Sequence, residues 1–238
     1  AGPTASGKSK LASVIAKKIN GEVINADSMQ IYKEFTVLSS RPSKKEMKKI
    51  RHHLYGVLSV KEHFSTGKWL YLVKKKINLC VKNKKIPILI GGTGLYFNAI
   101  TKGISKIPQI DRKIRENIRT LHNKIGQKKF YRKLILIDPI SKNKILPTDT
   151  QRTIRAYEVK ITTNKSIYEW ASNTRSDFLD FDIKKIFIDI PKDILLKNIS
   201  KRTTSMIKNK CIEEVKRFLK LNIDRSLSAN KIIGVREI

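Results

Sequence analysis

The sequence predicts an α/β fold with a parallel sheet at its centre and an all-helical insertion. Three observations carry this prediction. A phosphate-binding motif lies at residues 2–9, apolar segments of strand length alternate with helical segments after it, and residues 104–183 show only helical periodicity. We therefore expect a core domain at residues 1–103 and 184–238, with residues 104–183 inserted into it.

The phosphate-binding motif is Gly2-Pro3-Thr4-Ala5-Ser6-Gly7-Lys8-Ser9, with the spacing G-x-x-x-x-G-K-[ST] of a P-loop. Its glycines let backbone N–H groups turn toward phosphate oxygens, while Lys8 supplies a positive charge and Ser9 a hydroxyl for Mg²⁺. We therefore expect a P-loop NTPase-like core that binds a phosphorylated ligand. The motif also fits kinases, ATPases, GTPases and a few transferases. A P-loop normally follows a central strand, which is missing here, and the sequence stops just after a turn at Gly234. We therefore expect it to be truncated at both ends.

The segment after the P-loop predicts a helix and then a strand. Apolar residues repeat every four positions and indicate a buried helical stripe: Leu11, Ile15 and Ile19. Gly21 is expected to end this helix, because glycine adopts the backbone conformation of helix C-termini. Residues 22–27 then have the length and apolar content of a short strand.

Two later segments predict further strands. Residues 86–92 form a continuous apolar run, typical of a strand covered on both faces, and residues 186–190 are a third candidate. A helix before residues 86–92 has an apolar face made of Trp69, Leu72, Val73, Ile77 and Cys80. Ligands bind at the carboxyl ends of strands in open α/β sheets, so the residues after each strand are the candidates for the site.

The insertion predicts three helices. The first begins at the N-cap Asp111 and has the apolar positions Ile110, Ile114, Ile118, Leu121 and Ile125. The second has Phe130, Leu134 and Ile137, and the third starts after Asp149 with Ile154, Tyr157 and Ile161. A last helix, with Ile212, Val215 and Leu219 on one face, belongs to the core.

The charge balance favours a polyanionic partner. There are 51 Lys and Arg against 20 Asp and Glu, a formal net charge of +31, which fits nucleic acid. Solvated helix faces in a lysine-rich composition are the alternative explanation. Two cysteines argue against a disulfide framework or a zinc site and fit a reduced, cytoplasmic setting. No apolar run approaches the roughly 20 residues of a membrane span, so no membrane partner is expected.

Two strand ends carry candidate chemistry. Asp27, which leaves a strand opposite the P-loop, is placed to act as a general base or to reach Mg²⁺ through water; a helix N-cap is the alternative. Gly91 and Gly92 permit close approach of a ligand, and Thr93 offers a hydroxyl there. A purely structural turn explains these glycines equally well.

One helix of the insertion carries residues suited to nucleic acid. Gln151 and Arg155 lie one turn apart on the same face, and Arg152 lies beside them. Arginine suits phosphates and base edges, and glutamine suits adenine-like edges. A solvated basic face is the other explanation.

Taken together, these segments resemble the bacterial tRNA dimethylallyltransferase (tRNA isopentenyltransferase) family. The motifs run in order from Ala1 to Ile238: GPTASGKS, INADSMQIY, HHLYG, PILIGGTGLYF, DTQRTIRAYEV and IIGVRE. The resemblance implies transfer of a dimethylallyl group from dimethylallyl diphosphate to N6 of adenosine 37 in tRNAs reading codons that begin with U. It also implies Mg²⁺, a monomer, and an insertion that clamps the anticodon stem-loop. Whether ATP binds the P-loop stays open.

The resemblance also assigns roles to residues. The P-loop residues would hold the diphosphate: Gly2, Thr4, Ala5, Ser6, Gly7, Lys8 and Ser9, with Ser9 at the metal. Catalysis would depend on Asp27 as general base, Thr93, Lys8 and Arg202. The tRNA-contacting positions would be Asp27, Ser28, Met29, Gln30, Thr93, Arg115, Gln151, Arg152, Thr153, Ile154 and Arg155. A family histidine pair, His52 and His53, is expected to have a structural role.

Two other classes remain as alternatives. A small-molecule P-loop kinase would turn over ATP beneath a mobile, arginine-rich lid. A non-catalytic RNA-binding module would retain a vestigial P-loop. The presence of the functional residues Lys8, Ser9 and Asp27 argues against this alternative.

Overall fold

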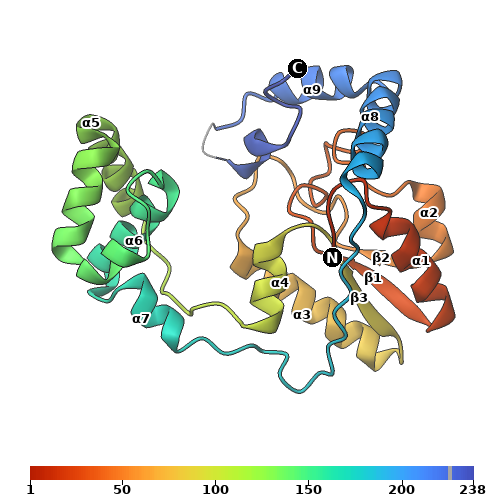
Figure 1. Ribbon diagram of the computed structural model, residues 1–238, viewed down its shortest axis with the longest axis horizontal. Helices are drawn as coiled ribbons and strands as arrows, with labels where there is room; N and C mark the ends of the chain where they lie inside the picture. The colour runs from red at the N-terminus through yellow and green to blue at the C-terminus, as the bar shows by residue number, and fades with distance from the viewer. Residues whose placement is uncertain (225–226) are drawn as a thin grey trace. The chain divides into compact units, whose positions relative to one another are not determined.

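The computed structural model describes residues 1–224 and 227–238 and confirms the α/β class (Figure 1). The chain forms two compact units, residues 1–100 with 180–238 and residues 101–179. The elements of the first unit are α1 (Lys8–Lys18), β1 (Gly21–Asn25), α2 (Lys44–Lys49), β2 (His52–His53), α3 (Thr66–Lys82), β3 (Ile86–Ile90), α4 (Gly94–Thr101), α8 (Lys192–Lys208), α9 (Cys211–Leu219) and the 3₁₀ helix η2 (Ser228–Lys231). Those of the second are α5 (Arg112–Ile137), η1 (Pro139–Asn143), α6 (Thr150–Thr163) and α7 (Ile167–Ser172).

The sheet is parallel, with the strand order β2-β1-β3. The register pairs Gly21 with Ile86 and Asn25 with Ile90, so β1 and β3 end at the same edge. Strand β2 was not predicted from the sequence. It is only two residues long, and it pairs with the middle of β1. Because the strands are parallel, the residues that follow them meet at one edge.

Helices α1 and α3 cover opposite faces of the sheet (Figure 1). Successive side chains of a strand point to opposite faces. Val23 accordingly packs in a cluster with Ala12 and Ala16 of α1, whereas the neighbouring Glu22 contacts Cys80 of α3. The predicted apolar face of α3 is confirmed, since its buried residues include Trp69, Val73, Ile77 and Cys80.

The predicted helix α1 is confirmed, but its predicted buried stripe is wrong. Leu11 and Ile19 are exposed, and the buried residues are Ala12 and Ala16. Ala12 and Ala16 pack in a cluster with Val23 of β1 and Ile90 of β3, so the small residues of the helix form its contact with the sheet. The turn after α1 uses Asn20, with φ of 54°, while Gly21 begins the strand.

The strand predicted at residues 86–92 is confirmed as β3, but it is not covered on both faces. Ile86 is 50% exposed, and the next three residues are only partly buried. No strand forms at residues 186–190, although the chain there is extended. Among the described residues its backbone partner is Ala1, which donates to the Ile186 carbonyl at 2.7 Å and accepts from the Ile188 N–H at 2.8 Å. A β-strand needs hydrogen bonds to several residues of a neighbouring strand, and Ala1 alone does not provide them.

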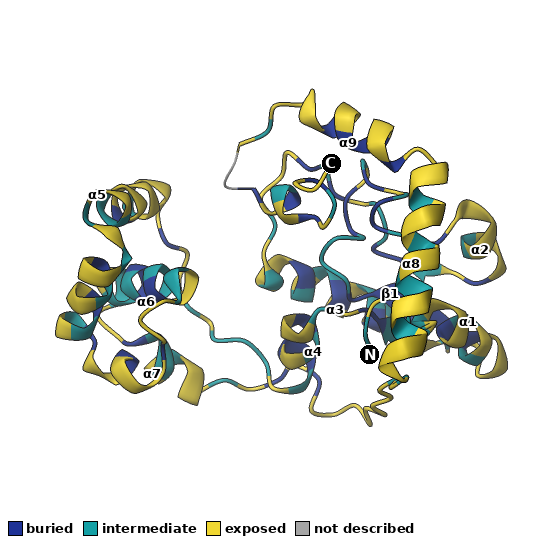
Figure 2. Ribbon diagram, turned by 45° about the horizontal axis from the view of Figure 1, so that its top comes forward, coloured by how far each residue is buried: buried dark blue, intermediate teal, exposed yellow. Residues whose placement is uncertain are grey.

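The C-terminal helices differ in burial, as Figure 2 shows. Helix α8 has no buried residue. Helix α9 buries Cys211, Glu214, Val215 and Phe218, and of the face predicted for it only Val215 is buried. Ile212 and Leu219 are exposed because they lie to one side of the buried face, which includes the carboxylate of Glu214.

The second unit is helical throughout. Helix α5 bends at Gly126, with φ of 76°, which separates the two predicted helices. The predicted N-cap Asp111 is confirmed, because it accepts from the Lys113 N–H at 2.7 Å. The third predicted helix does start after Asp149, whose side chain caps it by accepting from the Arg152 N–H at 3.0 Å. Leu134 and Ala156 belong to the core of this unit. None of the helices in residues 1–224 and 227–238 is long and apolar enough to cross a bilayer.

Candidate functional site

The P-loop leaves the start of α1 open to an anion. Gly7 has a left-handed backbone, with φ of 80°, and among the described residues no side chain caps the first N–H groups of α1. Unpaired N–H groups and the helix dipole together favour a bound phosphate. The loop is braced from α8, where the Asn198 amide donates to the Ala5 carbonyl at 3.2 Å.

A cavity of about 220 Å³ lies over this helix start. It is lined by Thr4, Ala5, Ser6, Gly7, Lys8, Ser9, Lys10, Asp27, Gln30, Ser40, Tyr55, Ile90, Gly91 and Arg202. Of the residues expected at the diphosphate, only Gly2 is outside this lining. A Cβ on Gly2 would lie 2.9 Å from the Ile188 carbonyl oxygen, so this glycine allows close backbone packing.

Two partly buried cations, Lys8 and Arg202, face one carboxylate, Asp27, in the cavity; the third cation of the lining, Lys10, is exposed. Burial lowers the pKa of Lys8, an effect that Asp27 opposes and Arg202 reinforces. Burial likewise lowers the pKa of Arg202, and Asp27 again opposes the shift. The two cations are thus partly desolvated and share a single carboxylate. An anionic ligand with more than one negative charge would compensate them better than Asp27 alone does.

Ser6 is one of the residues that line this cavity. Its hydroxyl is buried and has no hydrogen-bond partner among the residues that the structure describes. An unpaired buried hydroxyl is costly, and a phosphate oxygen would satisfy it. The cavity also offers the Ser9 hydroxyl and the Asp27 carboxylate. Oxygen donors of this kind are the ligands that Mg²⁺ prefers, usually together with water.

The end of β1 fixes the backbone of Asp27. The buried Asn25 side chain accepts from the Asp27 N–H at 2.8 Å and donates to the Asp27 carbonyl at 3.0 Å. One Asp27 oxygen, Oδ1, accepts from the Met29 N–H at 2.9 Å. This bond closes a local turn, and the first helix after Asp27 begins only at Lys44. Asp27 is therefore not a helix N-cap.

The end of β3 lies against the end of β1. A Cβ on Gly91 would come 2.0 Å from the Ala26 carbonyl oxygen, so this glycine is required by the approach of two backbones. The Thr93 N–H donates to the same carbonyl at 3.3 Å. The Thr93 hydroxyl accepts from the Ser28 N–H at 3.0 Å. These contacts bring Thr93 beside residues 27–30.

Sequence reasoning missed four residues of the lining: Lys10, Ser40, Tyr55 and Ile90. Tyr55 follows β2, and its ring meets the His52 ring edge-on with centroids 5.6 Å apart. Burial, with a smaller contribution from the Asp27 charge, raises the pKa of Tyr55 far above its usual value. It therefore presents a neutral phenol. The HHLYG segment was the available signal, but only its histidines were assigned a role.

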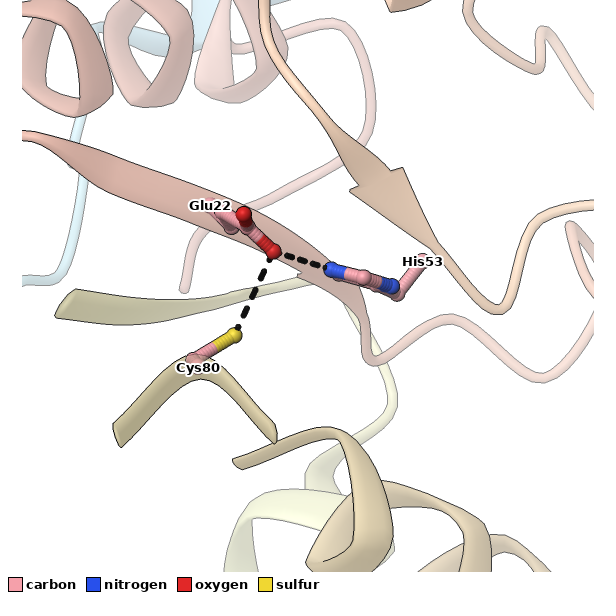
Figure 3. Close-up of side chains that lie close together, drawn as sticks. All are labelled: Glu22, His53 and Cys80. Carbon is pink, nitrogen blue, oxygen red and sulfur yellow. Dashed lines mark hydrogen bonds and ion pairs between the residues drawn. The ribbon is translucent and has the colours of Figure 1, made fainter. Parts of the chain in front are cut away.

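The expected structural role of His53 has a physical basis in a buried cluster (Figure 3). His53 Nε2 lies 2.6 Å from Glu22 Oε2, and the Cys80 thiol donates to the same oxygen at 3.6 Å. Burial opposes ionisation of Glu22, but the bonds from His53 and Cys80 outweigh it, so the pKa of Glu22 is lowered. Burial raises the pKa of Cys80 to about 11, which keeps the thiol protonated. The cluster links β1, β2 and α3.

The residues expected to contact RNA from the insertion lie in the second unit. Arg115 is exposed on α5, and Gln151 and Arg152 are exposed on α6. Arg152 pairs with Asp149 at 2.6 Å, and Arg155 lies 3.5 Å from the buried Glu158.

The other two residues of that segment are less accessible. Thr153 is fully buried, and its hydroxyl donates to the Asp149 carbonyl at 2.7 Å. Ile154 is partly buried. The surface of this segment is therefore formed mainly by Gln151, Arg152 and Arg155.

Comparison with known proteins gives a consistent result. A family profile described as IPP transferase matches residues 30–238. The chain is 54% identical over 237 residues to the tRNA dimethylallyltransferase of Pelagibacter ubique, covering 100% of this chain and 76% of that protein. It is 42% identical over 238 residues to the tRNA dimethylallyltransferase of Rickettsia massiliae, covering 100% of this chain and 66% of that protein.

Solved structures are similar over nearly the whole chain. The full-length tRNA isopentenylpyrophosphate transferase of Bacillus halodurans has a TM-score of 0.66 at 30% identity, covering 99% of this chain and 73% of that one. A eukaryotic dimethylallyltransferase acting on tRNA has a TM-score of 0.83 at 24% identity, covering 99% of this chain and 60% of that one. At this level of identity the similarity shows a shared fold.

Proposed function

The chain belongs to the IPP transferase family, and from this premise we propose that it is a tRNA dimethylallyltransferase. It transfers the dimethylallyl group of dimethylallyl diphosphate to N6 of adenosine 37 in tRNAs that read codons beginning with U. The observation that carries the proposal is the shared cavity of the P-loop, Asp27 and Arg202. It combines an anion site with one carboxylate able to accept a proton.

In this reaction the P-loop holds the leaving group. Backbone N–H groups at the start of α1, Lys8 and Arg202 bind the diphosphate oxygens, and the orphaned Ser6 hydroxyl donates to one of them. The Ser9 hydroxyl would hold Mg²⁺, which would supply positive charge to neutralise part of the leaving group. These contacts stabilise the charge that builds up as the bond between the allylic carbon and oxygen breaks.

Asp27 accepts the proton from the adenine amine. An exocyclic amine is a poor nucleophile, so removal of its proton as the C–N bond forms lowers the barrier. The hydrogen bonds from Asn25 fix the Asp27 backbone, and Thr93 fixes the turn that follows it. The target base leaves the stack of the anticodon loop, which costs a few kcal/mol and is cheapest in an unpaired loop.

The tRNA is held by residues of both units. Ser28, Met29 and Gln30 extend from the Asp27 turn, and Arg115 with the Gln151–Arg155 segment supplies contacts from the helical unit. The net charge of +31 supplies the part of the affinity that does not depend on sequence. We propose that the protein acts as a cytoplasmic monomer; both cysteines are free and buried, which suits a reducing compartment.

The test is transfer of label. Protein, Mg²⁺ and dimethylallyl diphosphate labelled in the prenyl group are incubated with tRNA whose anticodon loop has adenosines at and around position 37. The label is expected in the tRNA, at N6 of adenosine 37. Transfer of the γ-phosphate of ATP to a small acceptor, with no prenyl transfer, would instead identify a kinase.

A further inference from the structure

The buried carboxylate of Glu214 binds a loop at the edge of the cavity. Glu214 lies on α9 and is 5% exposed. Its Oε1 accepts from the N–H groups of Thr36 at 2.7 Å and Val37 at 3.0 Å, and its Oε2 accepts from the Leu38 N–H at 2.8 Å. Three consecutive N–H groups are therefore bound by one side chain that is distant in the sequence.

Apolar contacts fix the same loop against the C-terminal part of the chain. The rings of Phe35 and Phe218, one turn along α9 from Glu214, have centroids 4.8 Å apart. A Cβ on Gly234 would come 2.5 Å from the Leu38 side chain, so the backbone there lies directly against the loop. Loop, helix α9 and residue 234 thus form one packed assembly.

The other end of the loop reaches the diphosphate cavity. Ser40 lines this cavity. Its backbone is left-handed, with φ of 49°, a conformation that residues other than glycine rarely adopt. Such strain persists only where the surroundings impose it. The Gln30 amide donates to the Ser39 carbonyl at 3.0 Å and contacts the Ser40 carbonyl at 3.4 Å, and Gln30 also lines the cavity.

We propose that Glu214 is a positioning residue, whose carboxylate holds residues 36–38 so that Ser40 and Gln30 form their wall of the diphosphate cavity. This role rests on the proposed function, because it concerns binding of the same diphosphate. Glu214 does not itself line the cavity and acts only through the loop.

The substitution Glu214→Gln tests the role with little change of shape. A carboxamide has one oxygen, so its NH₂ group must face at least one N–H group that the carboxylate now accepts. Leaving one buried N–H group without an acceptor costs free energy that corresponds to about a tenfold change in the affinity for the diphosphate. Glu213→Gln is the matched control, because Glu213 is exposed on the same helix.

We expect Glu214→Gln to speed hydrogen exchange at the amides of residues 36–38. The KM for dimethylallyl diphosphate should rise about tenfold. The tRNA Kd should rise by a clearly smaller factor, because Gln30 is only one of the residues assigned to tRNA, and Glu213→Gln should change neither constant. Unchanged exchange would show that Glu214 does not hold the loop. Faster exchange with an unchanged KM, or equal losses in KM and tRNA Kd, would reduce Glu214 to a structural role.

Two further measurements keep the outcome decisive. If Glu214→Gln does not fold, Glu214→Asp retains the charge but is one methylene too short to reach all three N–H groups, and the same results are expected. If the wild-type protein transfers no prenyl group, the proposed function fails. Hydrogen exchange and the affinity for inorganic pyrophosphate would then still decide whether Glu214 shapes an anion site.

Discussion

The hydroxyl of Thr93 accepts a hydrogen bond from the backbone N–H of Ser28 at 3.0 Å. This bond joins the segment that follows β3 to the segment that follows β1. Because Ser28 comes directly after Asp27, the Thr93 hydroxyl helps to define where the Asp27 carboxylate points. The catalytic carboxylate of the proposed reaction is thereby tied to the neighbouring strand.

Thr93→Val should therefore impair turnover. Valine has the shape of threonine but leaves the Ser28 N–H without its acceptor, which corresponds to roughly a tenfold loss. Steady-state kinetics with saturating tRNA and dimethylallyl diphosphate measure the effect on kcat. Thr93→Ser retains the hydroxyl and should keep kcat within about twofold; an equal loss in both variants would contradict the role of the hydroxyl.

Lys8→Ala should weaken binding of dimethylallyl diphosphate. A hydrogen bond to a charged group contributes about 1.5–3 kcal/mol, which corresponds to roughly a 10- to 100-fold rise in KM. Lys17→Ala, in the last turn of the same helix, removes a charge far from the P-loop and serves as the control. A similar rise in KM for both variants would mean that Lys8 contributes only to the general charge.

Arg155→Ala should weaken tRNA binding without affecting the diphosphate. The logarithm of the tRNA association constant falls linearly with the logarithm of the salt concentration, and loss of one phosphate contact makes this slope less steep by about 1. Binding measured over a series of salt concentrations gives this slope, and Arg155→Lys, which keeps the charge, should restore most of it. An effect confined to diphosphate affinity would contradict the assignment of Arg155 to tRNA.

The buried cluster of Glu22, His53 and Cys80 predicts a pH-dependent contribution to stability. The pKa of Glu22 is lowered on folding from its ordinary value of 4.5, so ionised Glu22 stabilises the fold above that pH. The contribution is lost as the pH falls through the lower, folded pKa. Glu22→Gln should therefore reduce the free energy of unfolding at pH 7, and the difference from wild type should shrink below about pH 4.5.

Urea unfolding at several pH values measures this contribution. The exposed Glu213→Gln serves as control and should show no such difference. If the difference in free energy of unfolding between wild type and Glu22→Gln stayed constant down to pH 3, the carboxylate would contribute through packing alone.

The sequence predicted the parts of this structure whose signals are local. The P-loop spacing, the apolar face of α3, the N-cap Asp111 and the helix start after Asp149 each depend on residues within a few positions of one another. The residues after β1 and β3 followed from the general rule that parallel strands end at one edge. These features can be predicted without knowing which distant segments of the chain come together.

Other features depend on long-range contacts and were missed. The sequence does not show that α1 lies close enough to the sheet to bury alanines in place of Leu11 and Ile19. The two-residue strand β2 exists only because β1 lies beside it. In the sequence Glu214 resembles a charged residue on the solvent face of its helix, and its role depends on a loop far away in the sequence.

The role of Asp27 as general base is the central claim, and Asp27→Asn tests it most directly. Asparagine keeps the size and can still accept from the Met29 N–H, but it cannot take up the amine proton. Single-turnover transfer of labelled dimethylallyl to tRNA should slow by about 10²- to 10⁴-fold, while the tRNA Kd and the diphosphate affinity stay within about twofold of wild type. A single-turnover rate equal to that of wild type would show that another group, or none, accepts the proton.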